Sequence, residues 1–402
     1  MSRMAGGVRA AVAATALLVP SVARAADHLD TPTVIADPAA DIGDLFAWTS
    51  ADGRRLNLAM TVVAARFSDR LQYVFHVDSG RRFGATTATT LLVCTFDAAG
   101  VASCRLGSDR AHGDASVPPG LESERRRFRV FAGPRDDPFF NNVKGTRAAL
   151  EHARSALAAG ATKDASGCPR LDAATARAIL DLWRQTGGGP AVNFLAGWRS
   201  AALVISVDLA AVTTGGPLLA VWAGVHRPEG PADGTALGPA IERTGRPLTG
   251  NGLLGPLAPD AVSDERKERY NRAAPAGWPA FAADIQETLG LYDGFDGTCG
   301  NQWAAAEAGP ARYQALARVL ADDRLWVDST QRRCQELLAV ERAALGGPGA
   351  PGGDCGGRTP DEDVDVLRSL LVSGTPTSVD DGVDLDDADH STTAFPFLAA
   401  PK

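Results

Sequence analysis

Methionine is scarce in this chain of 402 residues. Of its three methionines, Met1 and Met4 precede the first apolar run, and only Met60 follows it. A haem or copper site that depends on methionine sulfur therefore has a single candidate ligand. The sequence also lacks a CxxC pair and the CxxCH motif, which argues against a metal-thiolate site and against a c-type cytochrome.

The signatures of several enzyme classes are missing as well. The sequence contains no G-x-S-x-G, no H-E-x-x-H and no Walker A motif. Gly250-Asn-Gly252-Leu-Leu-Gly255 does spell G-x-G-x-x-G, but Pro247 and Pro256 flank it and no strand leads into it. We predict a loop there, because dinucleotide binding requires a strand before this motif and a helix after it. Whether the protein is an enzyme stays open, and no reaction is identified.

An excess of positive charge is also absent, since the formal net charge is −8. An acidic surface argues against nucleic acid and anionic lipid as partners, whereas divalent cations are compatible with it. Beyond the N-terminus, no segment is apolar over the ~20 residues that a membrane-spanning helix needs. We expect no membrane span.

The N-terminus has the pattern of a secretory signal peptide at residues 1–25. Arginines precede the apolar run Ala10–Val19, and Ala23-Arg24-Ala25 places small residues at the −3 and −1 positions of a cleavage site. The run is about half the length of a membrane anchor. We expect a mature chain of residues 26–402 in the periplasm or the medium, with a net charge of about −11 because three arginines are removed.

Six cysteines in an exported chain indicate up to three disulfides. Cys94 and Cys104 flank a segment in which Gly100, in the left-handed conformation, closes a three-residue hairpin loop. That hairpin places the two cysteines opposite each other, so we predict a Cys94–Cys104 disulfide. The other four allow three pairings, of which proximity favours Cys334–Cys355; the four are Cys168, Cys299, Cys334 and Cys355.

The hydrophobic pattern predicts a mainly β protein of the α+β class. In 55–63, alternate residues are apolar, which is the period of a half-buried strand. Strands are expected at 44–49, 55–63, 71–78, 89–96, 101–106, 125–132, 200–209 and 217–225. Helices are expected at 146–159, 171–185, 312–322, 329–345 and 361–373.

We interpret this order as a single antiparallel β-sandwich-like domain over residues 26–402 that carries helical insertions and a helical C-terminal part. The β-rich core covers about 44–132 and 200–226. The helical insertions cover about 146–186 and 259–345. An acidic tail, rich in phenylalanine and proline, covers 374–402.

Aspartates are dense directly after the signal peptide. The segment 28–44 contains Asp30, Asp37, Asp41 and Asp44. Asp37-Pro38 is a typical helix start, and one helical turn would place Asp37, Asp41 and Asp44 on one side. Hard oxygen ligands favour Ca²⁺ over a transition metal. The alternative is that these aspartates cap turns and pair with arginines.

His28 suggests a separate, less favoured copper site. Cleavage after Ala25 would place this histidine third from a free amine. The amine, two amide nitrogens and the imidazole together form a square-planar set that suits Cu²⁺.

Two further polar clusters are candidates for cation binding. The segment Arg135–Asn141 contains Asp136 and Asp137 next to two phenylalanines, and an Arg–Asp pair that fixes the loop is the alternative. The segment Asp380–His390 is acidic but lacks the residue order of an EF-hand. Ca²⁺ binding is possible there, and a solvated acidic loop is the alternative.

Several of these segments together resemble a family of secreted bacterial proteins, the domain of unknown function 4331. The similar segments are His28–Ala47, Phe131–Phe140, Gly245–Pro247, Gly357–Asp363, Asp381–Asp384 and Phe395–Leu398. The resemblance covers nearly the whole mature chain and departs after Phe140, where a second phenylalanine-rich stretch is replaced by Asn141–Lys144. It implies a fold and an exported location, and it implies no reaction.

The preferred hypothesis is a secreted, metal-associated β-sandwich protein with a binding or structural role and a Ca²⁺-like ligand. The predicted metal ligands are His28, Asp30, Asp37, Asp41, Asp44, Asp136 and Asp137. A metal-dependent extracellular hydrolase that uses Asp136 or Asp137 is one alternative. A haem or copper-binding redox module is another, although Met60 and His76 lie on unlike faces of different predicted strands.

Overall fold

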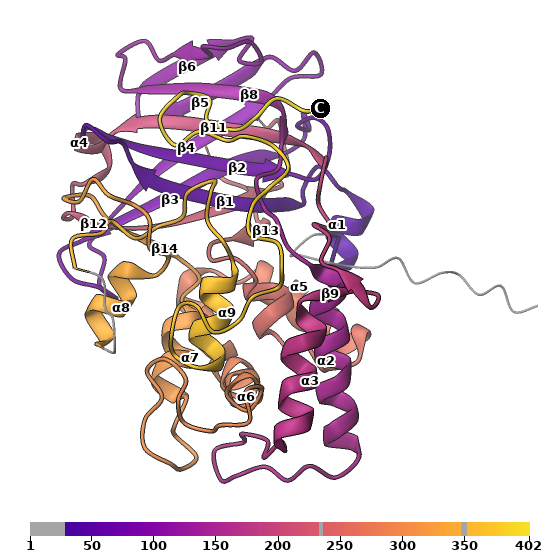
Figure 1. The fold of residues 1–402 in the computed structure, drawn as a ribbon. Coiled ribbons are helices and arrows are strands. Elements are labelled where there is room, and N and C mark those ends of the chain that lie inside the picture. The colour runs from indigo at the N-terminus through magenta and orange to yellow at the C-terminus, as the bar shows by residue number, and fades with distance from the viewer. Residues whose placement is uncertain (1–28, 233–235, 347–351) are drawn as a thin grey trace, which may run out of the picture.

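A computed structural model describes residues 29–232, 236–346 and 352–402 of the chain. Two antiparallel sheets pack face to face, and most of the helices lie below them in the view of Figure 1. The predicted α+β class with an antiparallel sandwich core and a helical C-terminal part is confirmed.

The first sheet has five strands in the order β1 (Ile42–Thr49), β2 (Arg55–Val62), β11 (Arg199–Asp208), β8 (Phe128–Asp136) and β7 (Leu121–Glu122). The second has the order β13 (Ala240–Thr244), β12 (Leu218–His226), β3 (Gln72–Gly80), β4 (Ala88–Phe96), β5 (Ala102–Leu106) and β6 (Asp109–Gly113). Beside β13, β14 (Leu325–Asp328) also pairs with β12. A small ribbon joins β9 (Gln185–Thr186) to β10 (Gly189–Pro190).

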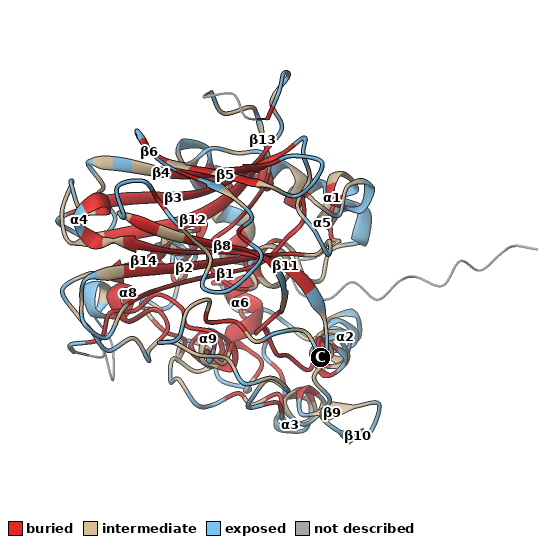
Figure 2. Cartoon of the chain, turned by 90° about the horizontal axis from the view of Figure 1, so that it is seen from above, coloured by how far each residue is buried: buried red, intermediate tan, exposed pale blue. Residues whose placement is uncertain are grey.

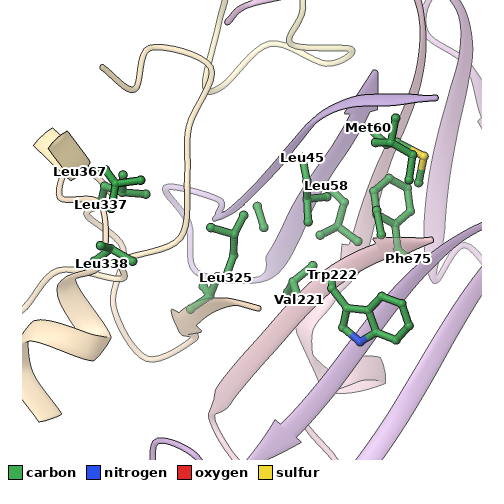
Figure 3. Packing of buried hydrophobic residues seen from close by; sticks show 14 of the residues in the cluster. Leu45, Leu58, Met60, Phe75, Val221, Trp222, Leu325, Leu337, Leu338 and Leu367 are labelled. Carbon is green, nitrogen blue, oxygen red and sulfur yellow. The ribbon is translucent and has the colours of Figure 1, made fainter. Parts of the chain in front are cut away.

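The main core lies between the two sheets. Leu58 and Met60 of β2 meet Phe75 of β3 and Val221 of β12, and all four are fully buried (Figure 3). Because successive side chains of a strand alternate between its faces, Trp222 points away from Val221 and the inner core. The alternation that predicted a strand at 55–63 is thus the inward and outward alternation of β2.

Helices and tight turns occupy the edge of the sandwich formed by β1, β13 and β14 (Figure 1). Asn142 caps one of them, because its side chain accepts a hydrogen bond from the N–H of Gly145. The helices of the described residues are α1 (Pro32–Ala36), α2 (Val143–Ala158), α3 (Ala173–Trp183), α4 (Leu209–Val212), α5 (Asp260–Asn271), α6 (Ala282–Asp293), α7 (Gln314–Ala321), α8 (Ala339–Leu345) and α9 (Asp365–Val372). Of these, α4 lies outside this layer, beside β3, β4 and β11. A π-helical turn, η1 (Thr249–Leu253), and a 3₁₀ segment, η2 (Pro275–Phe281), complete this layer.

The C-terminal segment packs on the outer face of the first sheet. Phe397 meets Trp48 of β1 edge to face, with 4.9 Å between the ring centroids. The indole N–H of Trp48 donates to the carbonyl of Thr392 at 3.0 Å. Figure 2 shows how deeply the strands of this sheet are buried, β1 and β11 included. Residues near the C-terminus therefore complete the sandwich.

Three disulfides involve all six cysteines. Cys94–Cys104 joins β4 to β5 at directly opposed positions, so the predicted pair is confirmed. Cys334–Cys355 is the pair favoured by proximity. Cys168–Cys299 spans 131 residues and ties the α2–α3 connection to the segment after α6.

Three local predictions were wrong. The segment 329–345 is helical only in α8, because Leu325–Asp328 pairs with β12 and the following loop contains a disulfide. Arg125–Arg127 lies in the turn before β8, not in the strand, and Arg126 has φ 56°. Asp37 ends α1 instead of starting a helix, because Pro32 takes the first helical position.

A fourth prediction was wrong in part: the segment that spells G-x-G-x-x-G is not a loop throughout, because residues 250–253 belong to the π-helical turn η1. The preceding strand, β13, ends at Thr244. Among the described residues, no helix combines the length and the apolar character needed to cross a bilayer.

Candidate metal centre

The N-terminal aspartates face different cationic partners. Asp37 lies on the surface and forms an ion pair with Arg227 at 2.6 Å. It borders a groove of about 1000 Å³ that is also lined by Arg70, Glu268 and Arg272. His28, the predicted copper ligand, lies outside the described residues. The expected alignment of Asp37, Asp41 and Asp44 along one helical turn does not occur, because β1 begins at Ile42.

Asp30 and Asp41 are buried at the contact between the N-terminal segment, β13 and α5. The ammonium group of Lys267 lies 3.4 Å from Asp30. Asp41 accepts a hydrogen bond from the N–H of Leu29 at 2.6 Å. Burial, and after it the charges of Asp30 and Asp41, raise the pKa of Glu242 well above its ordinary value. The three acids thus form one buried cluster, in which Lys267 pairs with Asp30.

Asp44 and Asp137 come together around Arg358. The Arg358 guanidinium forms an ion pair with Asp44 in which both side chains are almost fully buried. Its charge also lies over the rings of Phe46 at 4.3 Å and Phe139 at 5.3 Å. Asp44 and Phe46 belong to β1, whereas Asp137 and Phe139 follow β8. Segments far apart in the chain thus contact the same buried guanidinium group.

Backbone hydrogen bonds hold Arg358 in this position. Its N–H and carbonyl exchange two hydrogen bonds of 2.9 Å with Ala47 of β1. Burial, and next the charge of Asp44, raise the pKa of Asp137 to about 7, while Arg358 opposes the shift. Asp44 and Asp137 therefore lie close enough to influence each other, and the charge of Arg358 acts on both.

Asp136 belongs to a different group, with Asp386 and His390 from the C-terminal segment. One ligand atom from each of the three side chains lies within 4.8 Å of the other two. Asp136 ends β8, where it is paired with Arg199 of β11, and its N–H donates to the carbonyl of Ala399 at 3.0 Å. In the parts of the chain that the structure describes, no other group of three or more His, Cys, Asp or Glu side chains converges in this way.

The two carboxylates have unlike surroundings. Asp386 accepts hydrogen bonds from the Asn193 amide at 3.0 Å, from the N–H of Ala388 at 3.0 Å and from His390 at 3.1 Å. Both oxygens of Asp136 are buried, and neither accepts a hydrogen bond from any residue that the structure describes. Only 2% of the Asp136 side chain and 4% of the Asp386 side chain are exposed. Nε2 of His390 lies 3.7 Å from Oδ2 of Asp136, which is beyond hydrogen-bond distance. Two buried carboxylates side by side repel each other, so a proton or a cation is needed between the pair.

The pKa shifts agree with this asymmetry. Burial, and next the neighbouring Asp386, raise the pKa of Asp136 to about 7. Burial alone would raise the pKa of Asp386, but the hydrogen bonds from His390 and from the N–H of Ala388 lower it below its ordinary value. Asp386 is thus the ionised member of the pair at neutral pH.

The tautomer of His390 decides which atoms are available as ligands. The N–H of Ala399 donates to Nδ1 of His390 at 3.1 Å, so Nδ1 carries a lone pair. In the neutral ring the proton is then on Nε2, which donates to Asp386. A protonated Nε2 cannot ligate a metal. The site therefore offers carboxylate oxygens, and His390 orients one of the carboxylates.

The sequence predicts Asp136 as a ligand, but together with Asp137 and the N-terminal aspartates. It predicts the segment Asp380–His390 as a separate cation site or a solvated acidic loop. Nothing in the spacing shows that this segment returns to the end of β8. The phenylalanines of the C-terminal segment are the one available signal, because buried aromatic side chains imply that the segment packs against the core.

Comparison with known proteins identifies no relative: no protein family, no curated protein and no solved structure matches the chain. The resemblance to the domain of unknown function 4331 stays a prediction.

Replacing Arg358 by methionine should lower the free energy of unfolding by about 3–5 kcal/mol, because Asp44 and its neighbours would remain buried without a counter-charge. Arg54→Met is the matched control. Arg54 pairs with Asp52 at the surface, with 81% and 50% of the two side chains exposed, and should contribute less than about 1 kcal/mol. Urea denaturation at pH 7 measures both. Equal losses in the two variants would contradict a central role for Arg358.

Glu362 should make stability depend on pH. Burial raises the pKa of Glu362 to about 8, although Arg358 opposes the shift. An unfolded chain releases this proton near pH 4.3, so between about pH 4.3 and 8 the folded state holds the extra proton and its stability falls as pH rises. Glu362→Gln removes this contribution, whose slope is at most ~1.4 kcal/mol per pH unit. The variant should gain stability relative to the wild type from pH 5 to 8, and parallel stability curves would contradict the assignment.

Proposed function

We propose that the chain is an exported β-sandwich protein that binds a Ca²⁺-like cation between Asp136 and Asp386. Bound there, the ion would hold the C-terminal segment against the end of β8. The observation that carries the proposal is the buried carboxylate of Asp136, whose oxygens lack hydrogen-bond donors while a second carboxylate lies beside them. Carboxylate oxygens suit Ca²⁺ or Mg²⁺ better than a transition metal.

Export is supported by two independent features. All six cysteines form disulfides, which persist in oxidising compartments such as the periplasm and the medium. The N-terminal sequence has the pattern of a cleaved signal peptide. Membership of the domain of unknown function 4331 is part of this proposal, on the segments that resemble it.

A structural or binding role fits the site better than hydrolysis. A metal-dependent hydrolase needs substrate and water at the ion. Here the carboxylates of Asp136 and Asp386 are almost fully buried, and Asp137 is buried near the charge of Arg358. The ion would act as a clamp between two parts of the chain, in the manner of cations that stabilise a fold by binding only its folded state.

The proposal predicts that Ca²⁺ raises the melting temperature of the wild type by several degrees. At 100 times Kd, binding to the folded state alone adds about 2.7 kcal/mol. Asp136→Asn should abolish the response, because a neutral amide ligates poorly and can donate its N–H to Asp386 instead. Asp384→Asn, which removes an exposed acid from the same segment, is the matched control and should respond like the wild type.

Differential scanning calorimetry in Ca²⁺ and in chelator makes the measurement. If the wild type melts at the same temperature in both, Asp136 carries a proton and the cation proposal fails. A response that survives in Asp136→Asn would place the ion elsewhere.

A further inference from the structure

Two buried histidines lie on the face of the second sheet that points away from the first. His76 of β3 is opposite Trp222 of β12, and His226 of β12 is opposite Gln72 of β3. The rung between them pairs Val74 with Gly224. The histidines therefore share one face and flank the position at which β12 has no side chain. Their ring centroids are 5.6 Å apart.

Because Gly224 has no side chain, both imidazole rings approach β12 closely at this position. A Cβ placed on Gly224 would lie 3.1 Å from Nε2 of His226, 3.5 Å from Nε2 of His76 and 3.3 Å from Cζ3 of Trp222. The two nitrogens thus approach one point from two sides. The indole of Trp222 holds His76 in place by stacking on it, with 3.5 Å between the ring centroids.

Both Nε2 atoms are buried, and neither has a hydrogen-bond partner within residues 29–232, 236–346 and 352–402. His76 is 7% exposed and His226 is 6% exposed. Nδ1 of His226 lies 2.9 Å from the carbonyl of Gly238. A carbonyl only accepts, so Nδ1 carries the proton and Nε2 presents a lone pair to the space above Gly224. This tautomer is the opposite of that of His390, and it is the form in which a histidine ligates a metal.

The electrostatic surroundings of the two histidines are compatible with a metal ion near Gly224. Burial lowers the pKa of His76 to about 3, with a smaller contribution from His226, and burial also lowers the pKa of His226. Asp78, an acid on the same face of β3, is engaged by Arg324 at 3.1 Å and by the hydroxyl of Thr89.

We propose that His76 and His226 form a copper site in which Cu⁺ binds the two Nε2 lone pairs above Gly224. This site lies on the second sheet and is independent of the cation proposed between Asp136 and Asp386. Binding needs no electron transfer, because the ion keeps its oxidation state.

The ligand set favours Cu⁺ among biological cations. Imidazole nitrogen suits copper and zinc, whereas Ca²⁺ and Mg²⁺ require oxygen. Structural Zn²⁺ is nearly always held by four ligands, and burying a divalent ion without an anion beside it is costly. Cu⁺ carries half that charge and accepts two nitrogens. A buried water between the rings is the competing explanation.

Cu⁺ binding under anaerobic conditions, in competition with a chromophoric chelator, tests the proposal. The experiment uses the mature chain with His28→Ala, so that the predicted N-terminal copper ligand does not contribute. This protein should bind one Cu⁺. His76→Gln and His226→Gln should each weaken binding more than about 100-fold, as expected for the loss of a ligand. Gly224→Ala keeps both ligands, fills the space between them and should weaken binding at least tenfold.

His112→Gln is the matched control, because His112 is an exposed histidine on β6 of the same sheet. It should bind Cu⁺ like its parent, and circular dichroism shows whether each variant is folded. X-ray absorption of the Cu⁺-loaded parent needs no further variant and should show two imidazole nitrogens at about 2 Å. A parent that binds no Cu⁺, a sulfur ligand, or unchanged binding in folded His76→Gln and His226→Gln would overturn the proposal.

Discussion

The buried guanidinium of Arg358 is the contact on which the assembly of the chain most depends. It pairs with Asp44 of β1, lies over Phe46 and Phe139, and exchanges backbone hydrogen bonds with Ala47. Because a buried arginine is stable only when its charge is compensated, these segments must come together for any of them to be buried. The C-terminal third of the chain is thereby tied to the first strand.

The packing of the C-terminal segment against the first sheet also creates the candidate metal centre. Phe397 and Leu398 cover the outer face of the first sheet and bring Asp386 and His390 to the end of β8. At this centre and on the second sheet, a backbone group determines the tautomer of a histidine. The N–H of Ala399 makes His390 a donor to a carboxylate, whereas the carbonyl of Gly238 makes His226 a candidate ligand. Histidine thus has a different role at the two sites because its Nδ1 atom has a different backbone partner.

The sequence predicted features that depend on local pattern. The period-2 alternation of residues 55–62 and the hairpin around Gly100 are local, so β2 and the Cys94–Cys104 disulfide were predictable. Asp136 was named as a ligand, but its partners Asp386 and His390 are 250 or more residues away, and no periodicity encodes that contact. The convergence of His76 and His226 depends on the register of β3 with β12, which spacing alone does not determine. The helix expected at 329–345 was wrong because a strand pairing and a disulfide outweigh helix propensity.

The central claim, a cation held between Asp136 and Asp386, is tested most directly by anomalous diffraction from crystals grown with Mn²⁺, which accepts the same oxygen ligands as Ca²⁺. The account predicts an anomalous peak between the two carboxylates, within coordination distance of oxygens from both, and His390 donating to Asp386 without touching the ion. A map with no peak there, and with the two carboxyl groups sharing a short hydrogen bond, would contradict it.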